Sequence, residues 1–167
     1  YYIDTITGNA GKVTKTKDCV SSSGILYDNN YVKEIFFGRY VDSIGKYSFK
    51  NSKKLISLEL LNNFQKIGSS AFSECVELKY VTIGNSVTSI GSSAFENCTS
   101  LTGITVADNN QYYMDVDGNL YSKDCKTLIQ YAIGKTATTF TVPEGVTTLG
   151  DNAFYNCTSL KSVVIPE

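Results

Sequence analysis

The sequence predicts a mainly β repeat solenoid. We expect a parallel β-sheet on its concave face, short helical or 3₁₀ turns on the other face, and one β-hairpin insertion. The first observation is a regular period, because Phe49, Phe72 and Phe95 follow one another at a constant spacing of 23. The second is the spacing of 59 between Phe95 and Phe154, which fits one regular unit and one unit lengthened to 36. Self-similarity at a fixed period of about 20 to 50 residues is the signature of a repeat architecture.

Each unit contains one candidate strand with the pattern Leu-x-x-Leu-x-Leu. Apolar and outward positions alternate at the end of this pattern, as side chains do along a strand. Six copies fall into one register with a single extended turn, and each is expected to pair in parallel with its neighbour one unit away. Their apolar residues are Val32, Ile35 and Phe37; Leu55, Leu58 and Leu60; Leu78, Val81 and Ile83; Leu101, Ile104 and Val106; Ala137, Phe140 and Val142; and Leu160, Val163 and Ile165.

A turn is expected between the strands of successive units. It begins with glycine, which suits a backbone conformation closed to most residues, at Gly45, Gly68, Gly91 and Gly150. The next residue is expected to cap one short helical or 3₁₀ turn, and it is Ser69, Ser92 or Asp151. That turn should deliver its phenylalanine inward, so that the phenylalanines of successive units form a column.

The recurring unit has the sequence pattern Ile-Gly-x-x-Ala-Phe-x-x-Cys-x-x-Leu. Its Ala-Phe-x-x-Cys part recurs at residues 71–75, 94–98 and 153–157. The unit resembles the BspA-type leucine-rich repeat of bacterial and some protist surface proteins, over roughly residues 24–167. The first two units depart from it, because Asn51 with Ser52 stands where cysteine is expected and Leu26 stands loosely for phenylalanine. The resemblance implies the α/β leucine-rich-repeat fold and adhesion to host proteins, other cells or glycans.

We expect the chain to be organised in two parts. Residues 1–23 form an N-terminal cap or partial repeat, with a hairpin turning at Gly8-Asn9, and residues 24–167 form the leucine-rich repeat domain. The ending Ile165-Pro166-Glu167 copies residues 142–144, which continue into a further turn. The parent protein is therefore expected to have more repeats, with the last strand here as an unpaired edge.

The extended unit is expected to hold a small β-hairpin or meander within residues 107–136. Asp117-Gly118 lies between two runs of alternating apolar residues, which is a strong hairpin signal. We expect this hairpin to project from the stack and to be rich in tyrosine, at Tyr112, Tyr113, Tyr121 and Tyr131. A calcium loop starting at Asp115 is disfavoured, because glycine stands at its position 4 and lysine at 12, whereas an EF-hand needs glycine at 6 and glutamate at 12.

The composition excludes several kinds of chemistry. The chain has no histidine, so Ser-His-Asp triads, Cys-His nucleophiles and histidine-ligated zinc are impossible. A net charge of −1 gives no reason to expect nucleic acid, and no apolar run approaches the roughly 20 residues that span a bilayer. The chain has five cysteines, and an odd number cannot all pair in disulfides. A single disulfide that involves Cys19 stays an alternative. Buried thiols are expected at one repeat position, at Cys75, Cys98 and Cys157.

No catalytic, cofactor or metal site is predicted, and the outward strand positions are the candidate binding surface, because solenoids bind through such concave faces. Together with the hairpin they give Glu34, Phe36, Ser57, Glu59, Tyr80, Thr82, Thr105, Tyr112 and Tyr113. We expect a monomeric, non-catalytic binding or adhesion module of an extracellular or cell-surface protein, with a protein or glycan ligand. A passive spacer for another domain is the alternative. A glycosidase that uses Asp115 and Asp117 is a remote one.

Overall fold

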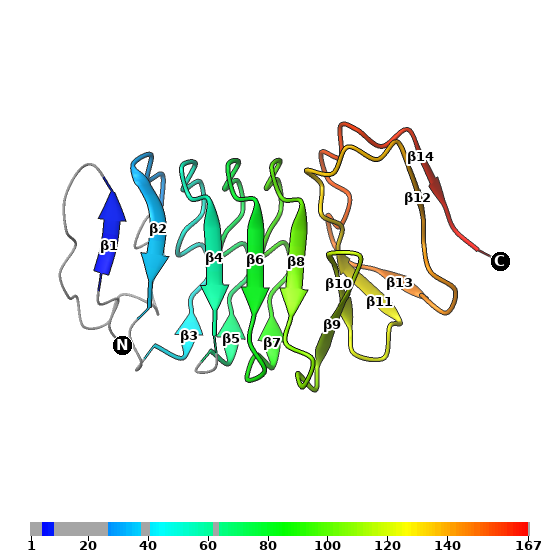
Figure 1. The fold of residues 1–167 in the computed structure, drawn as a ribbon, viewed down its shortest axis with the longest axis horizontal. Helices are drawn as coiled ribbons and strands as arrows, with labels where there is room; N and C mark the ends of the chain where they lie inside the picture. The colour runs from blue at the N-terminus through cyan, green and yellow to red at the C-terminus, as the bar shows by residue number, and fades with distance from the viewer. Residues whose placement is uncertain (1–4, 9–26, 38–40, 62–63, 167) are drawn as a thin grey trace.

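The computed structural model describes residues 5–8, 27–37, 41–61 and 64–166. Within them the chain winds into a mainly β solenoid whose turns stack side by side (Figure 1). The strands are β1 (Thr5–Gly8), β2 (Val32–Phe36), β3 (Ser43–Ile44), β4 (Ser57–Leu60), β5 (Lys66–Ile67), β6 (Tyr80–Ile83), β7 (Ser89–Ile90), β8 (Gly103–Val106), β9 (Tyr113–Val116), β10 (Asn119–Ser122), β11 (Thr127–Gln130), β12 (Thr139–Thr141), β13 (Thr148–Leu149) and β14 (Ser162–Val164).

Two parallel sheets run along the regular part of the stack. One has the order β4-β6-β8 and the other, made of two-residue strands, has the order β3-β5-β7. Leu58 pairs with Val81 and Val81 with Ile104, so every partner lies one repeat period away. These three side chains are buried. The predicted parallel pairing one unit away is therefore confirmed for these strands.

The turns between the two sheets are not helical, which corrects the expected helical or 3₁₀ segments. No helix occurs in the part of the chain that the structure describes. Alternate N–H groups of a turn donate to the next turn instead, as Phe49 does to Ala71 O at 2.8 Å and Phe72 to Ala94 O at 2.9 Å. Each turn also holds residues with positive φ, such as Ser70 at 52°. A right-handed helix cannot pass through such residues, so Ser69, Ser92 and Asp151 do not cap helices.

The prediction that the turn glycines adopt a backbone conformation closed to other residues is also wrong. These glycines allow adjacent turns to pack closely instead. Positive φ is found at Gly118 and Gly145, not at the glycines that begin the described turns. A Cβ atom on Gly91 would lie 2.4 Å from the backbone nitrogen of Ser69, and one on Gly68 would lie 2.5 Å from the carbonyl carbon of Gly45. Only glycine lets the backbones of adjacent turns approach this closely.

The interior of the stack contains the predicted phenylalanine column over three units. The rings of Phe49 and Phe72 lie 5.2 Å apart, and those of Phe72 and Phe95 lie 5.8 Å apart, both nearly parallel. The column does not continue directly from Phe95 to Phe154. Tyr131, which is fully buried, takes the inward position of the long unit and packs on Phe154 at 5.4 Å.

The long unit divides the stack, so the six predicted strands do not lie in one sheet. Strands β12 and β14 form a separate parallel pair, and the hairpin β9–β10 lies beside β8 (Figure 1). The hairpin at Asp117-Gly118 is present as predicted, with φ of 50° and 73° at its two turn residues, as a two-residue hairpin turn requires. It packs against β8 and caps its open edge.

Three groups of the hairpin supply the acceptors that a further repeat strand would have supplied. The Ile104 N–H donates to Gly118 O at 2.9 Å. The Val106 N–H donates to the Asp115 carboxylate at 2.7 Å, and the Ile90 N–H of β7 donates to the Tyr113 hydroxyl at 2.9 Å. Buried donors without a partner are costly, so these bonds explain how the repeat can be interrupted at this point.

The two ends of the chain differ from the regular stack. Strand β1 pairs antiparallel with β2. The expected turn at Gly8-Asn9 lies partly outside the described residues, and Cys19 lies wholly outside them. Val163 and Ile165, predicted to face the core, are exposed because β14 lies on the last described turn and β12 covers only one side of it. Ala137 is exposed because the insertion separates the start of β12 from β8.

Candidate binding surface

The outward face of β4, β6 and β8 carries the candidate residues in two rows that cross the sheet. The first row joins Ser57, Tyr80 and Gly103, which are register partners. The second row joins Glu59, Thr82 and Thr105 in the same way. All of these residues are exposed or half-buried, while the residues between them face the core. The structure therefore brings five of the predicted residues together on one surface.

Tyr80 is the most prominent group on this strand face, with 60% of its surface exposed. Its ring lies beside Gly103, where a Cβ atom would be 3.8 Å from the Tyr80 Cδ1. Gly103 in turn contacts Gly118 of the hairpin, since a Cβ on Gly118 would lie 3.2 Å from the Gly103 Cα. Neither glycine carries a side chain that could cover the Tyr80 ring on the side of the hairpin. Tyrosine offers a rigid contact surface with a polar end.

Glu34 and Phe36 lie on β2, at the other side of β4 (Figure 1). Both are exposed, and Phe36 has 55% of its surface exposed. Strand β2 is tied to the β4 region by a hydrogen bond from the Ile56 N–H to Lys33 O at 3.0 Å. It is paired with β1 and is not part of the β4–β6–β8 sheet. The structure thus places these two residues next to the strand face and on a different sheet.

The tyrosines of the long unit do not form the predicted projecting patch. Tyr121 and Tyr131 are fully buried, and Tyr113 is half-buried with its hydroxyl bonded to the Ile90 N–H. Burial raises the pKa of Tyr113, and it raises the pKa of Tyr121 to about 12. Tyr112 is exposed by 53% and stays available for a ligand. Alternation along a strand predicts which tyrosines share a face, but it does not predict which face the solenoid covers.

The recurring cysteine of the unit is structural where the stack is complete. Cys75 and Cys98 are fully buried, and their thiols lie 3.2 Å from the carbonyl oxygens of Phe49 and Phe72. Burial raises the pKa of Cys75 to about 12 and that of Cys98 well above its usual value, which makes these thiols unreactive. Cys157 is half-buried, and its pKa is raised to about 11 by burial.

The acidic residues of the hairpin have separate tasks. Asp115 accepts a hydrogen bond from the Val106 N–H, whereas Asp117 is exposed at the turn and its carbonyl accepts from Lys135. Burial lowers the pKa of Lys135.

Within the described ranges no group of three or more Cys, Asp or Glu side chains is placed to hold a metal ion. No helix there is long and apolar enough to cross a membrane.

A family model supplies the decisive comparison. The model of the BspA type leucine-rich repeat region matches six copies over residues 22–117 and 131–167. The chain belongs to the BspA-type leucine-rich repeat family. The match is interrupted at residues 118–130, which include β10 and β11. The part that the family model leaves out is therefore the part that divides the stack.

Solved structures with the same fold come from bacterial proteins. The pneumococcal vaccine antigen PcpA is 28% identical, with a TM-score of 0.62 over 76% of this chain and 37% of that one. A leucine-rich repeat protein from Bacteroides ovatus is 25% identical, with a TM-score of 0.52 over 99% and 41%. A leucine-rich cell surface protein from Faecalibacterium prausnitzii, at 21% identity and a TM-score of 0.52 over 72% and 44%, shows the fold alone. The chain thus spans less than half the length of each of these proteins, and no curated protein sequence matches it.

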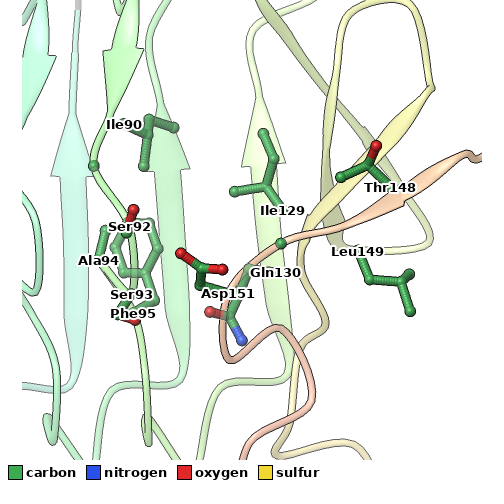
Figure 2. Close-up of a pocket in the computed structure, with 12 residues that line it drawn as sticks. Ile90, Ser92, Ser93, Ala94, Phe95, Ile129, Gln130, Thr148, Leu149 and Asp151 are labelled. Carbon is green, nitrogen blue, oxygen red and sulfur yellow. The ribbon is translucent and has the colours of Figure 1, made fainter.

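A cleft at the edge of the long unit was not predicted from the sequence. It has a volume of about 280 Å³ and lies between the turn of β7 and the turn of β13 (Figure 2). Ser92, Ser93, Gln130 and Asp151 contribute its polar groups. The sequence carries one signal for this cleft, which is the short spacing between Leu128 and Tyr131 compared with that between Ile67 and Phe72. A shorter turn must leave space between its neighbours in a regular stack.

Proposed function

We propose that this chain is a non-catalytic binding module of a cell-surface or secreted bacterial protein, and that its ligand is a protein or glycan held on the strand face of β4, β6 and β8. Membership of the BspA-type family and the likeness to a bacterial vaccine antigen support a surface location. The observation that carries the choice of face is Tyr80, an aromatic side chain exposed at the centre of an ordered sheet.

The geometry of this face suits an extended, partly polar ligand. Tyr80 supplies an apolar contact area, and the neighbouring row supplies the hydroxyl groups of Thr82 and Thr105 and the carboxylate of Glu59. These groups can form hydrogen bonds with peptide or sugar groups. The hairpin borders the surface at β8. Phe36 on β2 and Tyr112, directly before β9, are exposed aromatic residues of the elements on either side of the sheet (Figure 1).

The proposal is tested by applying the purified chain to a printed glycan array and an array of purified secreted proteins. Binding should then be measured for Tyr80→Ala, Phe36→Ala and Tyr112→Ala. Tyr155→Ala is the matched control, because Tyr155 is similarly exposed, by 54%, but lies in the turn before β14. We expect the Tyr80 variant to lose at least tenfold in affinity for any captured ligand, since an aromatic anchor contributes more than about 1.4 kcal/mol.

Two outcomes would contradict the proposal. One is a ligand whose affinity is unchanged by all three substitutions on the strand face. The other is a ligand whose affinity falls with Tyr155→Ala alone, which would place binding on the turns. A chain that binds nothing on either array, within a parent protein that binds through another domain, would favour a spacer.

A further inference from the structure

The backbone of the regular stack forms a ladder of peptide groups that runs from one turn to the next. The Tyr47 N–H donates to Ser69 O at 3.2 Å, and the Ser70 N–H donates to Ser92 O at 3.0 Å. The Ser69 carbonyl and the Ser70 N–H belong to the same peptide group. Each peptide group at this place therefore accepts from the turn before it and donates to the turn after it.

The ladder is interrupted at the long unit because the turn between Leu128 and Tyr131 is two residues shorter than the corresponding turn of a regular unit. Leu128 pairs with Leu149 in β13, as Ile67 pairs with Ile90 in β7. The Tyr131 N–H donates to Ala153 O, as the Phe72 N–H donates to Ala94 O. Tyr131 comes three positions after Leu128, whereas Phe72 comes five positions after Ile67. The missing pair corresponds to Ser69 and Ser70, so the peptide group that carries the ladder is the one that is lost.

The cleft described above is the space that this missing peptide group leaves. One wall is the turn with Ser92 and Ser93, and the other is Gly150 with Asp151 (Figure 2). Among the described residues, the N–H groups of Ser93 and Phe95 donate to no backbone carbonyl, and no backbone N–H donates to the carbonyl of Asp151. A side chain bridges the two turns instead, since the Asn152 amide donates to the Ser93 hydroxyl at 3.1 Å.

We propose that this cleft binds a short peptide segment of a partner, whose peptide group completes the ladder. Its carbonyl would accept from the Ser93 N–H, and its N–H would donate to the Asp151 carbonyl. A peptide is favoured over an isolated amide group because Ser93 and Phe95 present N–H groups on alternate residues, the spacing at which an extended backbone pairs. This site lies on the turns, apart from the strand face of the proposed function.

The walls also specify the kind of peptide. Turn residues equivalent to the second missing residue have positive φ, 52° at Ser70 and 57° at Ser93, which favours glycine at that place in the ligand. The Asp151 carboxylate points into the cleft (Figure 2), so an acidic side chain would be repelled. The expected ligand is an uncharged segment with a small residue followed by glycine.

The test is a titration of the ¹⁵N-labelled chain with the blocked peptide acetyl-Gly-Ser-Gly-Gly-amide, followed by NMR. We expect saturable shifts of the Ser93 and Phe95 amide signals. The amides of Ser70 and Phe72 occupy the same positions one unit earlier and are already bonded to Ser92 and Ala94, so they serve as internal controls and should not shift. The same peptide with aspartate in place of serine should bind at least tenfold more weakly.

Two changes to the chain complete the test. Insertion of Ser-Ser between Ile129 and Gln130 should restore the missing peptide group and reduce peptide affinity at least tenfold. If the insertion prevents folding, Ser92→Trp should block the cleft to the same extent, whereas Ser69→Trp, one unit earlier and away from the cleft, should leave affinity unchanged. The proposal is overturned by the absence of a saturable shift at Ser93, by affinity that Ser92→Trp does not alter, or by binding of N-acetylglucosamine without binding of the peptide.

Discussion

The contact between phenylalanine rings of adjacent turns can be measured as a coupling energy. Phe49 and Phe72 stack at 5.2 Å with ring planes 5° apart, and Phe72 separates Phe49 from Phe95. In a solenoid, each unit contacts only its neighbours, so stability is a sum of unit and nearest-neighbour contributions. The double substitution Phe49→Leu/Phe72→Leu should therefore show coupling that Phe49→Leu/Phe95→Leu lacks.

The expected magnitudes follow from the geometry of the rings. An aromatic pair in contact contributes about 0.5–1.5 kcal/mol beyond the area that it buries, so we expect a coupling energy of about 1 kcal/mol for Phe49 and Phe72. Pairs without contact are additive within about 0.5 kcal/mol. Leucine is preferred to alanine, because each buried Phe→Ala change would cost about 3–5 kcal/mol. Two such changes would remove most of the stability of a domain of this size.

The assay is equilibrium unfolding in urea, followed by circular dichroism, for the wild type, three single variants and two double variants. Differences in the urea midpoint report stability alone when the free energy of unfolding of all variants falls with the same slope against urea concentration. Coupling of the same size for the Phe49/Phe95 pair would refute the reasoning. That result would mean that the units interact over more than one neighbour.

Three further predictions concern the hairpin, the turns and a buried thiol. Asp115→Ala leaves the Val106 N–H without its acceptor and should lower the free energy of unfolding by about 1–3 kcal/mol. Asp117→Ala, at the exposed turn, should change the free energy of unfolding by less than about 0.5 kcal/mol. Equal effects of the two substitutions in urea unfolding would contradict the capping role of Asp115. Gly91→Ala places a Cβ 2.4 Å from Ser69 N and should destabilise strongly, whereas Gly103→Ala, with its nearest atom at 3.8 Å, should not; two similar urea midpoints would show that the turns can separate. Because the pKa of Cys75 is raised by burial from 9.0 to about 12, the folded state binds its proton more tightly, and this contribution to stability is complete below pH 9 and lost as the pH rises toward 12. The urea midpoint should fall over that range less steeply in Cys75→Ala than in the wild type, and parallel pH profiles would contradict the assignment.

Much of the regular stack could be predicted from the sequence because its cause is local and repeated. The regular spacing of Leu58, Val81 and Ile104 requires those strands to be neighbours, since any other register would expose the apolar side chains. The hairpin at Asp117-Gly118 was predictable for a similar reason, because a two-residue turn with positive φ demands such residues.

The form of the turns was not predictable from residue types alone. A serine after glycine suits an N-cap, but it also suits a turn whose N–H groups bond to the next unit. Which of the two forms depends on the neighbouring turn, one repeat unit further along the chain, which supplies acceptors such as Ala94 O to Phe72. The sequence identifies the glycines correctly as turn residues, yet their reason is the approach of another backbone at Gly68 and Gly91.

The long unit was hardest to predict because it does not repeat. Tyr131 replaces phenylalanine in the column, and Tyr113 supplies a hydroxyl where the regular stack has a carbonyl. The sequence assigns both tyrosines to a projecting surface, since nothing in the chain close to them indicates the open edge that they cover. The candidate strand face can be located from alternation, and its contact with the hairpin at Gly103 required the structure.

The most direct test of the account is residue-resolved amide hydrogen exchange of the free chain. Amides that the hairpin caps, at Ile90, Ile104 and Val106, should exchange as slowly as those bonded within the regular stack, such as Phe72. The amides of Ser93 and Phe95, at the interrupted ladder, should exchange much faster than Ser70 and Phe72, their equivalents one unit earlier. Equal protection of all four turn amides would show that the stack continues unbroken through the long unit, and it would contradict the account.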